Sequence, residues 1–584
     1  MENFYKDNAD IAFHLDHMDL SRVIDLLEEG FGEAETFPEA PSDAADALDN
    51  YRRVLDIVGE IAGSYVAPRA RDVDAQGATF ADGKVTYAKG TSEALDRLRK
   101  AELMGFTLPR RYGGLNLPKT IYSMATEIIS RADASLMNLF GLQEIGDTIY
   151  KFGSEDQRQR FLPRFADGSV SGAMALTEPD AGSDLQAVML RANQAADGQW
   201  RLNGVKRFIT NGCADVSLVM ARSEPGSTGG RGISLFIYER EAHMRIRRIE
   251  HKLGIHGSPT CEMQFNDAPA ELLGKRKFGL VKYTMSLMNG ARLGVAAQSV
   301  GIAEAAYRAS RRYARDREQF KKSILRFPAI YEMLTDMQVN IEAARSLLYE
   351  TARLVDIKEG IEHRIARHPD RGGDLREDEK RYTRYAALFT PMVKAMASEM
   401  VNAVCYDAIQ IHGGVGFTQE FDVERYYRDA RITNIYEGTT QLQVVAAIGG
   451  VIGGVVFERL NDWEADNDFE PVSNLYQRAR GCRTRLEAAI AAVKARNDGS
   501  YQEYHAARLV SIATDTVCAY LLCRDARHDP RKRQVAAAFL AKAEPRIQAA
   551  MVHLESGDTT VIDHHGTILG DAGEVCRMPG DAPA

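Results

Sequence analysis

The sequence predicts a mainly α-helical protein with a central β domain, and three observations support this fold class. Apolar residues recur every three or four positions from Ala44 to about Arg131, as on one face of a helix. From about Ser169, short β-rich runs such as WRLNGVKRFITNG (200–212) alternate with turn residues, which is typical of a small barrel or sandwich. Helical spacing returns in residues 285–320 and continues, after an acidic stretch, to the end of the chain.

These changes of pattern divide the chain into an N-terminal arm, an N-terminal helical domain, a middle β domain, a helical bundle and an extra C-terminal helical module. The expected bounds are 1–43, 44–168, 169–284, 285–458 and 459–584. The acidic sequence NDWEADNDFEP (461–471) is interpreted as the linker that opens the last module. The densely charged residues 357–380 predict a solvated connection between two helices.

Composition limits the class of protein. The 584 residues are 45% hydrophobic and 27% charged, which is ordinary globular usage. The net charge is -9, and residues 451–584 hold 16 Lys and Arg against 19 Asp and Glu, so we expect no nucleic-acid partner. The longest strongly apolar stretch, Val444 to Phe457, has 14 residues, whereas a membrane span needs about 20, so none is expected.

The N-terminus and the cysteines predict the compartment. The first 20 residues lack the basic and apolar regions of a signal peptide and the Arg- and Ser-rich composition of a transit peptide. The seven cysteines are scattered and never form a C-x-x-C pair, which favours a reducing compartment. We therefore expect a cytoplasmic protein without a metal site.

Three short sequences contain residues suited to ligand binding, although each also has a structural interpretation. LTEPDAGSD (176–184) forms a tight loop that offers N–H groups and hydroxyls, or is simply a loop. FITNG (208–212) ends in Asn-Gly, which by itself predicts a β-hairpin. REQF (317–320) suits a pyrophosphate and a ring, or is an exposed helix face.

Two further sequences are rich in glycine. QIHGGVGF (410–417) permits close approach to a phosphate or ends a helix, and His412 is expected to be a packed or capping residue. In YEGTTQ (436–441), Glu437 is a candidate general base beside free backbone N–H groups, or a carboxylate at the start of a helix.

Taken in order, ALTEPDAGSD, FITNG, REQF, QIHGGVGF and YRDARITNIYEGTTQ resemble the acyl-CoA dehydrogenase family over roughly residues 50–450. The chain length and C-terminal module are similar to the large subgroup that includes the 3-methylmercaptopropionyl-CoA dehydrogenases. The resemblance implies an N-terminal helical domain, a middle β barrel and a C-terminal four-helix bundle, plus the extra helical module.

The resemblance also implies an FAD flavoprotein of fatty acid β-oxidation that oxidises an acyl-CoA thioester to its trans-2-enoyl-CoA. Glu437 would remove the α-proton while the β-hydrogen leaves as hydride to flavin N5. The thioester oxygen would accept hydrogen bonds from the Glu437 N–H and a flavin ribityl hydroxyl. Electrons would pass to an electron-transferring flavoprotein, and the chain would form a homodimer or higher homo-oligomer. Ala291 stands where a minority of members carry the base, so Glu437 is the one candidate.

By position, the family's FAD contacts fall on fourteen residues: Met174, Leu176, Thr177, Ser183, Phe208, Thr210, Arg317, Gln319, Phe320, Gln410, Gly413, Gly414, Thr439 and Gln441. Gln410 and the two glycines would serve a neighbouring subunit. The implied substrate contacts are Ser183, Arg292, Tyr436 and Phe140. One FAD contact is in doubt, because Lys321, Lys322 and Phe327-Pro328 depart from the family pattern.

The helix expected to line the acyl pocket, SLMNLFGLQEIG (135–146), contains no Arg, which disfavours a dicarboxylic substrate such as glutaryl-CoA. Phe140 favours a limited or branched chain. Two alternatives within the same fold remain open: an acyl-CoA oxidase that uses oxygen, and a DNA-binding damage-response flavoprotein. The acidic C-terminal module and the intact YEGTTQ argue against the second. Packing against the bundle is the favoured role of that module, ahead of membrane or nucleic-acid binding.

Overall fold

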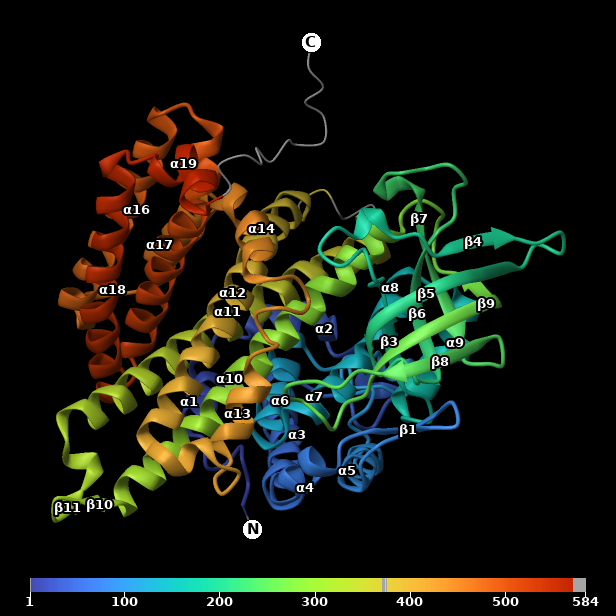
Figure 1. Cartoon of the computed structure of the whole chain (residues 1–584), viewed down its shortest axis with the longest axis horizontal. Coiled ribbons are helices and arrows are strands. Elements are labelled where there is room, and N and C mark those ends of the chain that lie inside the picture. Colours follow the sequence, from blue (N-terminus) through green and yellow to red (C-terminus); the bar gives the residue numbers. More distant parts are fainter. Residues whose placement is uncertain (1, 370–372, 374, 571–584) are drawn as a thin grey trace. The chain divides into compact units, whose positions relative to one another are not determined.

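The computed structural model describes residues 2–369, 373 and 375–570. Most of these residues are helical, and one seven-stranded sheet comes between two helical parts of the sequence, which confirms the predicted mainly α fold with a central β domain (Figure 1). The chain forms two compact units, one up to Gln443 and one from Val444. Each unit is described by itself.

The first unit begins with a series of helices, of which α6 is almost entirely buried and packs against α3 and α7. Their bounds are α1 Ala9–His17, α2 Ser21–Glu28, α3 Ala44–Glu60, α4 Ala70–Gln76, α5 Lys89–Lys100, α6 Lys119–Ala132, α7 Ala134–Gly141, α8 Ile145–Phe152 and α9 Glu155–Ala166. The residue before α6 is Pro118, whose side chain cannot accept a hydrogen bond from the first N–H groups of the helix. Asp356, from another helix, caps α6 instead. The Asp356 carboxylate accepts from the backbone N–H groups of Lys119 and Thr120 at 2.6 and 2.9 Å.

The sheet curls toward a barrel because both ends of its strand order are tied together. The strands are β3 Gly172–Ala175, β4 Arg191–Gln194, β5 Trp200–Thr210, β6 Val216–Arg222, β7 Ile233–Glu239, β8 Met244–Ile249 and β9 Thr260–Leu272. Their order is β3-β6-β4-β5-β9-β7, β8 pairs with β9, and an additional β6–β7 pairing closes the path. A separate hairpin joins β1 Thr79–Ala81 to β2 Lys84–Thr86.

Asn211-Gly212 does not form the β-hairpin that its sequence favours. Strand β5 pairs with β4 and β9, whereas β6 pairs with β3, β4 and β7. Asn211 adopts a left-handed conformation (φ 55°), and its buried amide donates to the Gly172 carbonyl at 3.0 Å. The dipeptide therefore joins two non-adjacent strands and ties the end of β5 to β3.

Three long helices form the bundle of the first unit: α10 Met285–Asp316, α11 Pro328–Arg367 and α12 Arg376–His412. The short strands β10 Glu318–Gln319 and β11 Lys322–Ser323 form a hairpin after α10, and α13 Val423–Ala430 and α14 Thr440–Ile452 follow α12. The prediction of a solvated connection over 357–380 is wrong for its first half. Helix α11 continues to Arg367 because Ile357 and Ile361 are fully buried among the charged residues.

The predicted N-terminal arm packs into this unit through a buried ion cluster. Arg345 of α11 is completely buried and bonds to Asp10 at 2.5 Å, Glu127 at 2.7 Å and Glu304 at 2.8 Å. These carboxylates come from α1, α6 and α10, so one guanidinium joins four helices. The Tyr349 hydroxyl adds a bond to Glu127 at 2.6 Å.

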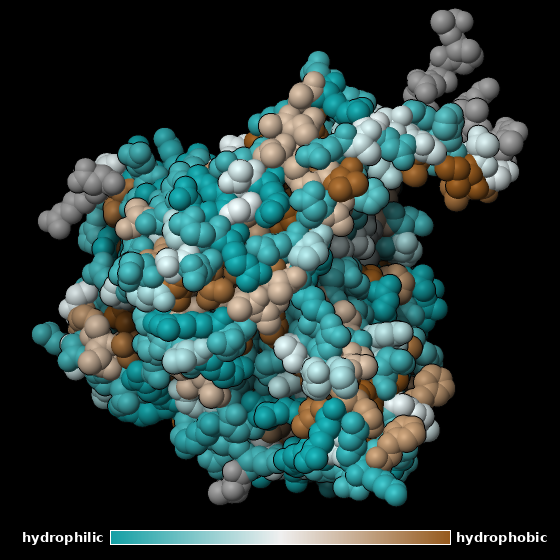
Figure 2. All heavy atoms as spheres, turned by 90° about the vertical axis from the view of Figure 1, so that its left-hand side faces the viewer, coloured by the Kyte–Doolittle hydropathy of each residue, from teal (hydrophilic) through white to brown (hydrophobic). Residues whose placement is uncertain are grey.

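The second unit contains α15 Val455–Asp466, α16 Ser473–Ala495, α17 Gly499–Ala526, α18 Pro530–Ser556 and α19 Thr560–Ile568. Helices α16, α17 and α18 pack on one another. Most of the predicted linker 461–471 is helical, because Leu460 and Trp463 bury one face of α15. On the face shown in Figure 2, hydrophilic side chains predominate and apolar ones are scattered.

Helix α17 is long and apolar enough to cross a membrane by length and composition, but 83% of its most apolar window is buried inside the protein. Helices α14 and α15 are long and apolar enough only when taken as one segment, and the chain bends by 65° at the short break between them. Such helices are common in the cores of proteins, so the expected absence of a membrane span stays a prediction.

We predict that Arg345→Met strongly destabilises the chain, because it removes the cation shared by three buried carboxylates. Loss of one partner of a buried ion pair costs about 3–5 kcal/mol. Urea unfolding followed by circular dichroism measures the change. The control, Arg53→Ala, breaks an exposed pair with Asp49 and should move the unfolding midpoint little. Equal midpoints for the two variants would contradict the prediction.

Candidate active site

A cavity of about 700 Å³ lies within the first unit. Its walls come from α6, α7, α8, α10, α11 and α12, from strands β3 and β5, and from the turn that precedes α14. Five residues singled out from the sequence line it: Met174, Thr210, Ala291, Tyr436 and Glu437. The structure therefore brings together parts of two of the five motifs, FITNG and YEGTTQ, with Met174, which directly precedes the first motif, and Ala291.

Glu437 lies on a strained turn. Glu437 and Gly438 both have left-handed backbone conformations (φ 55° and 89°), which is costly for a residue with a side chain. Their carbonyl groups are held by side chains. Gln443 Nε2 donates to both carbonyls at 3.1 and 2.8 Å, and Arg292 Nε donates to the Glu437 carbonyl at 3.4 Å. Lys394 Nζ donates to the Gly438 carbonyl at 2.7 Å.

This arrangement leaves the Glu437 backbone N–H available to a ligand. Within the described chain, no acceptor lies within hydrogen-bond distance of this N–H. The same residue lines the cavity. A hydrogen-bond donor and a carboxyl group are thus presented by a single residue, as an enolising site requires.

The electrostatics of Glu437 combine burial with nearby cations. Desolvation raises the pKa of its carboxyl group, and the positive charges of Arg292 and Lys394 oppose that rise. Burial in turn lowers the pKa of Lys394 to about 8, although the negative charge of Glu437 opposes the decrease. The cavity therefore contains a carboxyl group whose pKa is shifted toward neutral pH, which suits a base.

Tyr436 anchors the turn to two helices. Its hydroxyl donates to Gln298 Oε1 of α10 and lies 3.4 Å from Asn138 Oδ1 of α7. The Gln298 amide donates to Asn138 Oδ1 at 3.0 Å and to the Ala134 carbonyl at 2.8 Å. These bonds fix the residue immediately before the candidate base.

The predicted flavin residues of the β domain lie near one another. Met174 and Thr210 line the cavity directly. The Arg207 N–H donates to the Thr177 carbonyl at 2.9 Å, so the loop that contains Leu176 and Thr177 runs beside the end of β5. Phe208 is half exposed with a left-handed backbone (φ 61°). Ser183 is exposed in the loop after Thr177.

A buried ion pair that was not singled out from the sequence holds this loop. Lys206 is fully buried, and its ammonium group bonds to Glu178 and to the Leu176 carbonyl, both at 2.8 Å. Glu178 also accepts from the backbone N–H groups of Met189 and Leu190 at 2.6 and 3.0 Å. The glutamate in LTEPDAGSD therefore supports the loop rather than facing the cavity.

The remaining predicted FAD residues do not line the cavity of this chain. Arg317, Gln319 and Phe320 belong to the exposed hairpin after α10, which Figure 1 shows far from the sheet. The cavity ends near Val295, so roughly 30 Å of α10 separates the two places. Gln410, Gly413 and Gly414 end α12, and Thr439 and Gln441 begin α14.

Gly413 serves as the C-terminal cap of α12 in a left-handed conformation (φ 65°). His412 is packed, as expected: its ring stacks on Tyr313 with centroids 4.3 Å apart, and Nδ1 lies 2.7 Å from the Ala408 carbonyl. A role of Gln410, Gly413 and Gly414 in a neighbouring subunit stays a prediction.

Phe140 does not line the cavity. It is 1% exposed and stacks on Tyr122 with ring centroids 5.4 Å apart, because α7 is rotated so that Met137, Asn138 and Gly141 face the cavity instead. These three residues and Lys394 are the ones missed from the sequence. In a short helix that is apolar all round, residues spaced by three or four positions can be found on every face. The sequence pattern therefore could not show which face of α7 lines the cavity.

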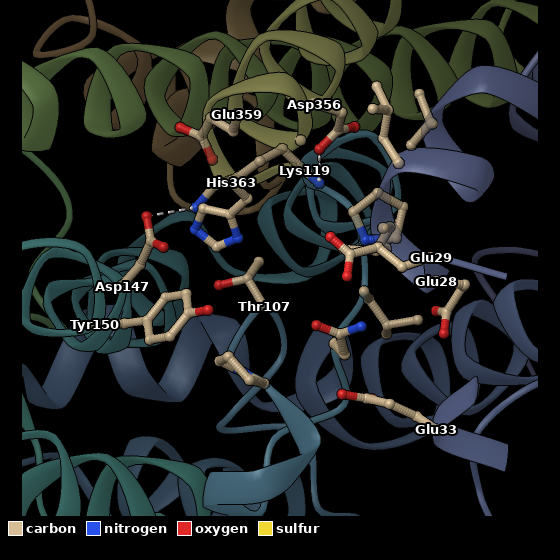
Figure 3. A pocket seen from close by; sticks show the side chains of 18 of the residues that line it. Glu28, Glu29, Glu33, Thr107, Lys119, Asp147, Tyr150, Asp356, Glu359 and His363 are labelled. Atoms are coloured by element: carbon tan, nitrogen blue, oxygen red, sulfur yellow. Dashed lines mark hydrogen bonds and ion pairs between the residues drawn. The ribbon is translucent and has the colours of Figure 1, made fainter. Parts of the chain in front are cut away.

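A second cavity of about 240 Å³ lies behind one wall of the first (Figure 3). Lys119, Asp147, Lys151, Glu359 and His363 line both cavities. The ammonium group of Lys151 bonds to Asp147 at 2.8 Å and to Glu359 at 2.6 Å, and Lys119 bonds to Asp147 at 3.1 Å. The wall that the two cavities share is therefore formed largely by lysine–carboxylate ion pairs. Among the described residues, no group of His, Cys, Asp and Glu is arranged to hold a metal ion.

Comparison with known proteins agrees with this geometry. Residues 49–169, 173–268 and 281–448 match the N-terminal, middle and C-terminal domains of acyl-CoA dehydrogenases, and residues 453–556 match the acyl-CoA dehydrogenase C-terminal family. The 3-methylmercaptopropionyl-CoA dehydrogenase of Ruegeria pomeroyi is 33% identical over 75% of each chain.

Two solved structures are similar over much of their length. An acyl-CoA dehydrogenase complexed with FAD from Bacillus anthracis is 27% identical, with a TM-score of 0.72, over 87% of this chain and 88% of that one. A chain from a structure of the electron transferring flavoprotein of Acidaminococcus fermentans is 35% identical, with a TM-score of 0.59, over 69% and 97%.

The fold and the site define a flavin-dependent oxidoreductase. The chain belongs to the acyl-CoA dehydrogenase family, in a form with an extra C-terminal helical domain. Its cofactor is FAD. The residues present fit this group, because the Met174 side chain and the Thr210 hydroxyl line a cavity of ligand size, with the Thr177 loop beside them.

Proposed function

We propose that the protein dehydrogenates an acyl-CoA at its α,β-carbons with Glu437 as the base that removes the α-proton. One observation supports this role most strongly: Glu437 presents a carboxyl group to the cavity from a turn whose own N–H is free to bind the thioester oxygen. A single oxyanion donor of this kind is worth roughly 2.7–4 kcal/mol.

The chain's other residues position these two groups. Arg292 and Gln443 donate to the Glu437 carbonyl and so hold the turn that carries both groups. Tyr436, bonded to Gln298, fixes the preceding residue. The family resemblance places the base at position 437 or, in a minority of members, at position 291. Position 291 holds an alanine, which cannot accept a proton, so Glu437 is the proposed base. The FAD, when bound, supplies the acceptor for the β-hydride.

We further propose a homodimer or higher homo-oligomer in the cytoplasm that passes its electrons to an electron-transferring flavoprotein. The likeness to a chain from the Acidaminococcus fermentans structure supports that partner. Arg317, Gln319 and Phe320 lie roughly 30 Å along α10 from the cavity, so a second copy would be needed for them to contact the same FAD.

We predict that Glu437→Gln abolishes reduction of the flavin by acyl-CoA, because an amide cannot accept the α-proton. The rate of flavin bleaching in an anaerobic titration should fall by about 10²- to 10⁴-fold. Bound FAD should remain, as the visible spectrum will show. The matched control is Glu503→Gln, which changes an exposed glutamate and should bleach at the wild-type rate. Normal bleaching by the Glu437 variant would refute the proposed base.

We predict that the rate of flavin reduction increases with pH through the pKa of Glu437. The carboxyl group must be ionised to act as the base, and burial raises its pKa. The midpoint should therefore lie above about 4.3, the value of an ordinary glutamate. Stopped-flow measurements of flavin bleaching across pH give this midpoint. A rate independent of pH down to about 4.3 would contradict the assignment.

We predict that neutral acyl groups are preferred to dicarboxylic ones. The cavity face of α7 carries no cation, and Lys119 and Lys151 already pair with carboxylates. Turnover should be measured with glutaryl-, butyryl-, octanoyl- and palmitoyl-CoA, together with oxygen consumption and peroxide formation to test the oxidase alternative. A clear preference for glutaryl-CoA would contradict the prediction.

A further inference from the structure

We propose that Lys394 is a positioning residue of the reaction: it holds the Glu437–Gly438 turn in its strained conformation and keeps the Glu437 carboxyl group in its ionised form. This inference rests on the proposed role of Glu437 as the base. It assigns a function to a buried lysine that none of the five sequence motifs contains.

The position of Lys394 is unusual for a lysine. It lies in the middle of α12 and is completely buried, although lysines are almost never fully buried without a partner. Its ammonium group donates to the Gly438 carbonyl at 2.7 Å. Among the described residues, it makes no ion pair within 4.0 Å. The lysine therefore binds the backbone of the catalytic turn rather than a neighbouring carboxylate.

That bond opposes the strain of the turn. Glu437 and Gly438 are both in left-handed conformations, and for Glu437, which is not a glycine, this conformation costs of order 1–3 kcal/mol. Such a conformation persists only where surrounding contacts hold it. Gln443 donates to the same Gly438 carbonyl at 2.8 Å, so this oxygen accepts from two side chains. The carbonyl is thereby directed toward α12 and away from the cavity.

The charge of Lys394 acts on Glu437. A buried carboxyl group without a nearby cation remains protonated at neutral pH and cannot act as a base. Arg292 on α10 and Lys394 on α12 are the two cations that lower the pKa of Glu437, and Glu399 on α12 is the other carboxylate that faces Lys394. Lys394 thus offsets part of the desolvation of Glu437, together with Arg292.

Three substitutions separate the two roles. Lys394→Gln keeps a donor for the Gly438 carbonyl but removes the charge, Lys394→Arg keeps the charge, and Lys394→Met removes both. The control, Lys532→Met, changes a buried lysine of the second unit, outside the cavity. All variants are studied as FAD-loaded full-length chains, and thermal unfolding confirms that each one folds.

The pH midpoint of flavin reduction is the main measurement. Removal of a nearby opposite charge raises a carboxyl pKa, so the midpoint should rise, by about 1 unit, in Lys394→Gln and Lys394→Met. Lys394→Arg and the control should keep the wild-type midpoint. At saturating pH, Lys394→Met should be slower than Lys394→Gln, by up to about 100-fold, because the turn is no longer held. Infrared difference spectra, with Glu437→Gln as the reference, report the protonation of Glu437 independently of activity.

An unchanged midpoint and an unchanged infrared titration in Lys394→Gln would overturn the inference, even if the rate fell, because a purely structural lysine would give that result. If Lys394→Met does not fold, the glutamine and arginine variants still decide the question. Failure of the proposed function is distinguishable, since Glu437→Gln would then bleach normally whatever Lys394 does.

Discussion

The site depends on a single backbone feature, the left-handed turn at Glu437 and Gly438. In this conformation both carbonyls point to buried donors, and the Glu437 N–H has no acceptor within the described chain. An ordinary helical or extended conformation would direct these groups elsewhere. The proposed base and the proposed oxyanion donor are therefore positioned together by one strained pair of residues, which the surrounding side chains hold in place.

The donors that hold the turn come from helices far apart in the sequence. Arg292 lies on α10, Lys394 on α12, and Asn138 on α7 reaches the turn through Tyr436. One of these helices, α10, is joined in turn to α1, α6 and α11 by the buried ion pairs of Arg345. Packing of the bundle is thus part of the catalytic geometry, and a change distant from the cavity can act on it by displacing a helix.

The helix–strand–helix order could be predicted because apolar spacing reports which face of an element is buried. The prediction from this spacing was wrong at residues 357–367. There the densely charged sequence indicates a solvated connection, but Ile357 and Ile361 bury one face of a helix. Within the site, motif order indicated Glu437 and Thr210, which meet at the cavity. Lys394 could not be predicted, because a single lysine in a long helix has no sequence pattern that distinguishes a buried position from an exposed one.

Glu437 and Lys394 are best understood as a coupled pair. Burial disfavours the charged form of each group, raising the pKa of the acid and lowering that of the amine to about 8. Each charge stabilises the other. When the carboxylate accepts the α-proton it loses its charge, and by reciprocity the lysine loses part of its stabilisation in the same step. In the proposed mechanism, the free energy of proton abstraction therefore includes the response of Lys394, which does not line the cavity.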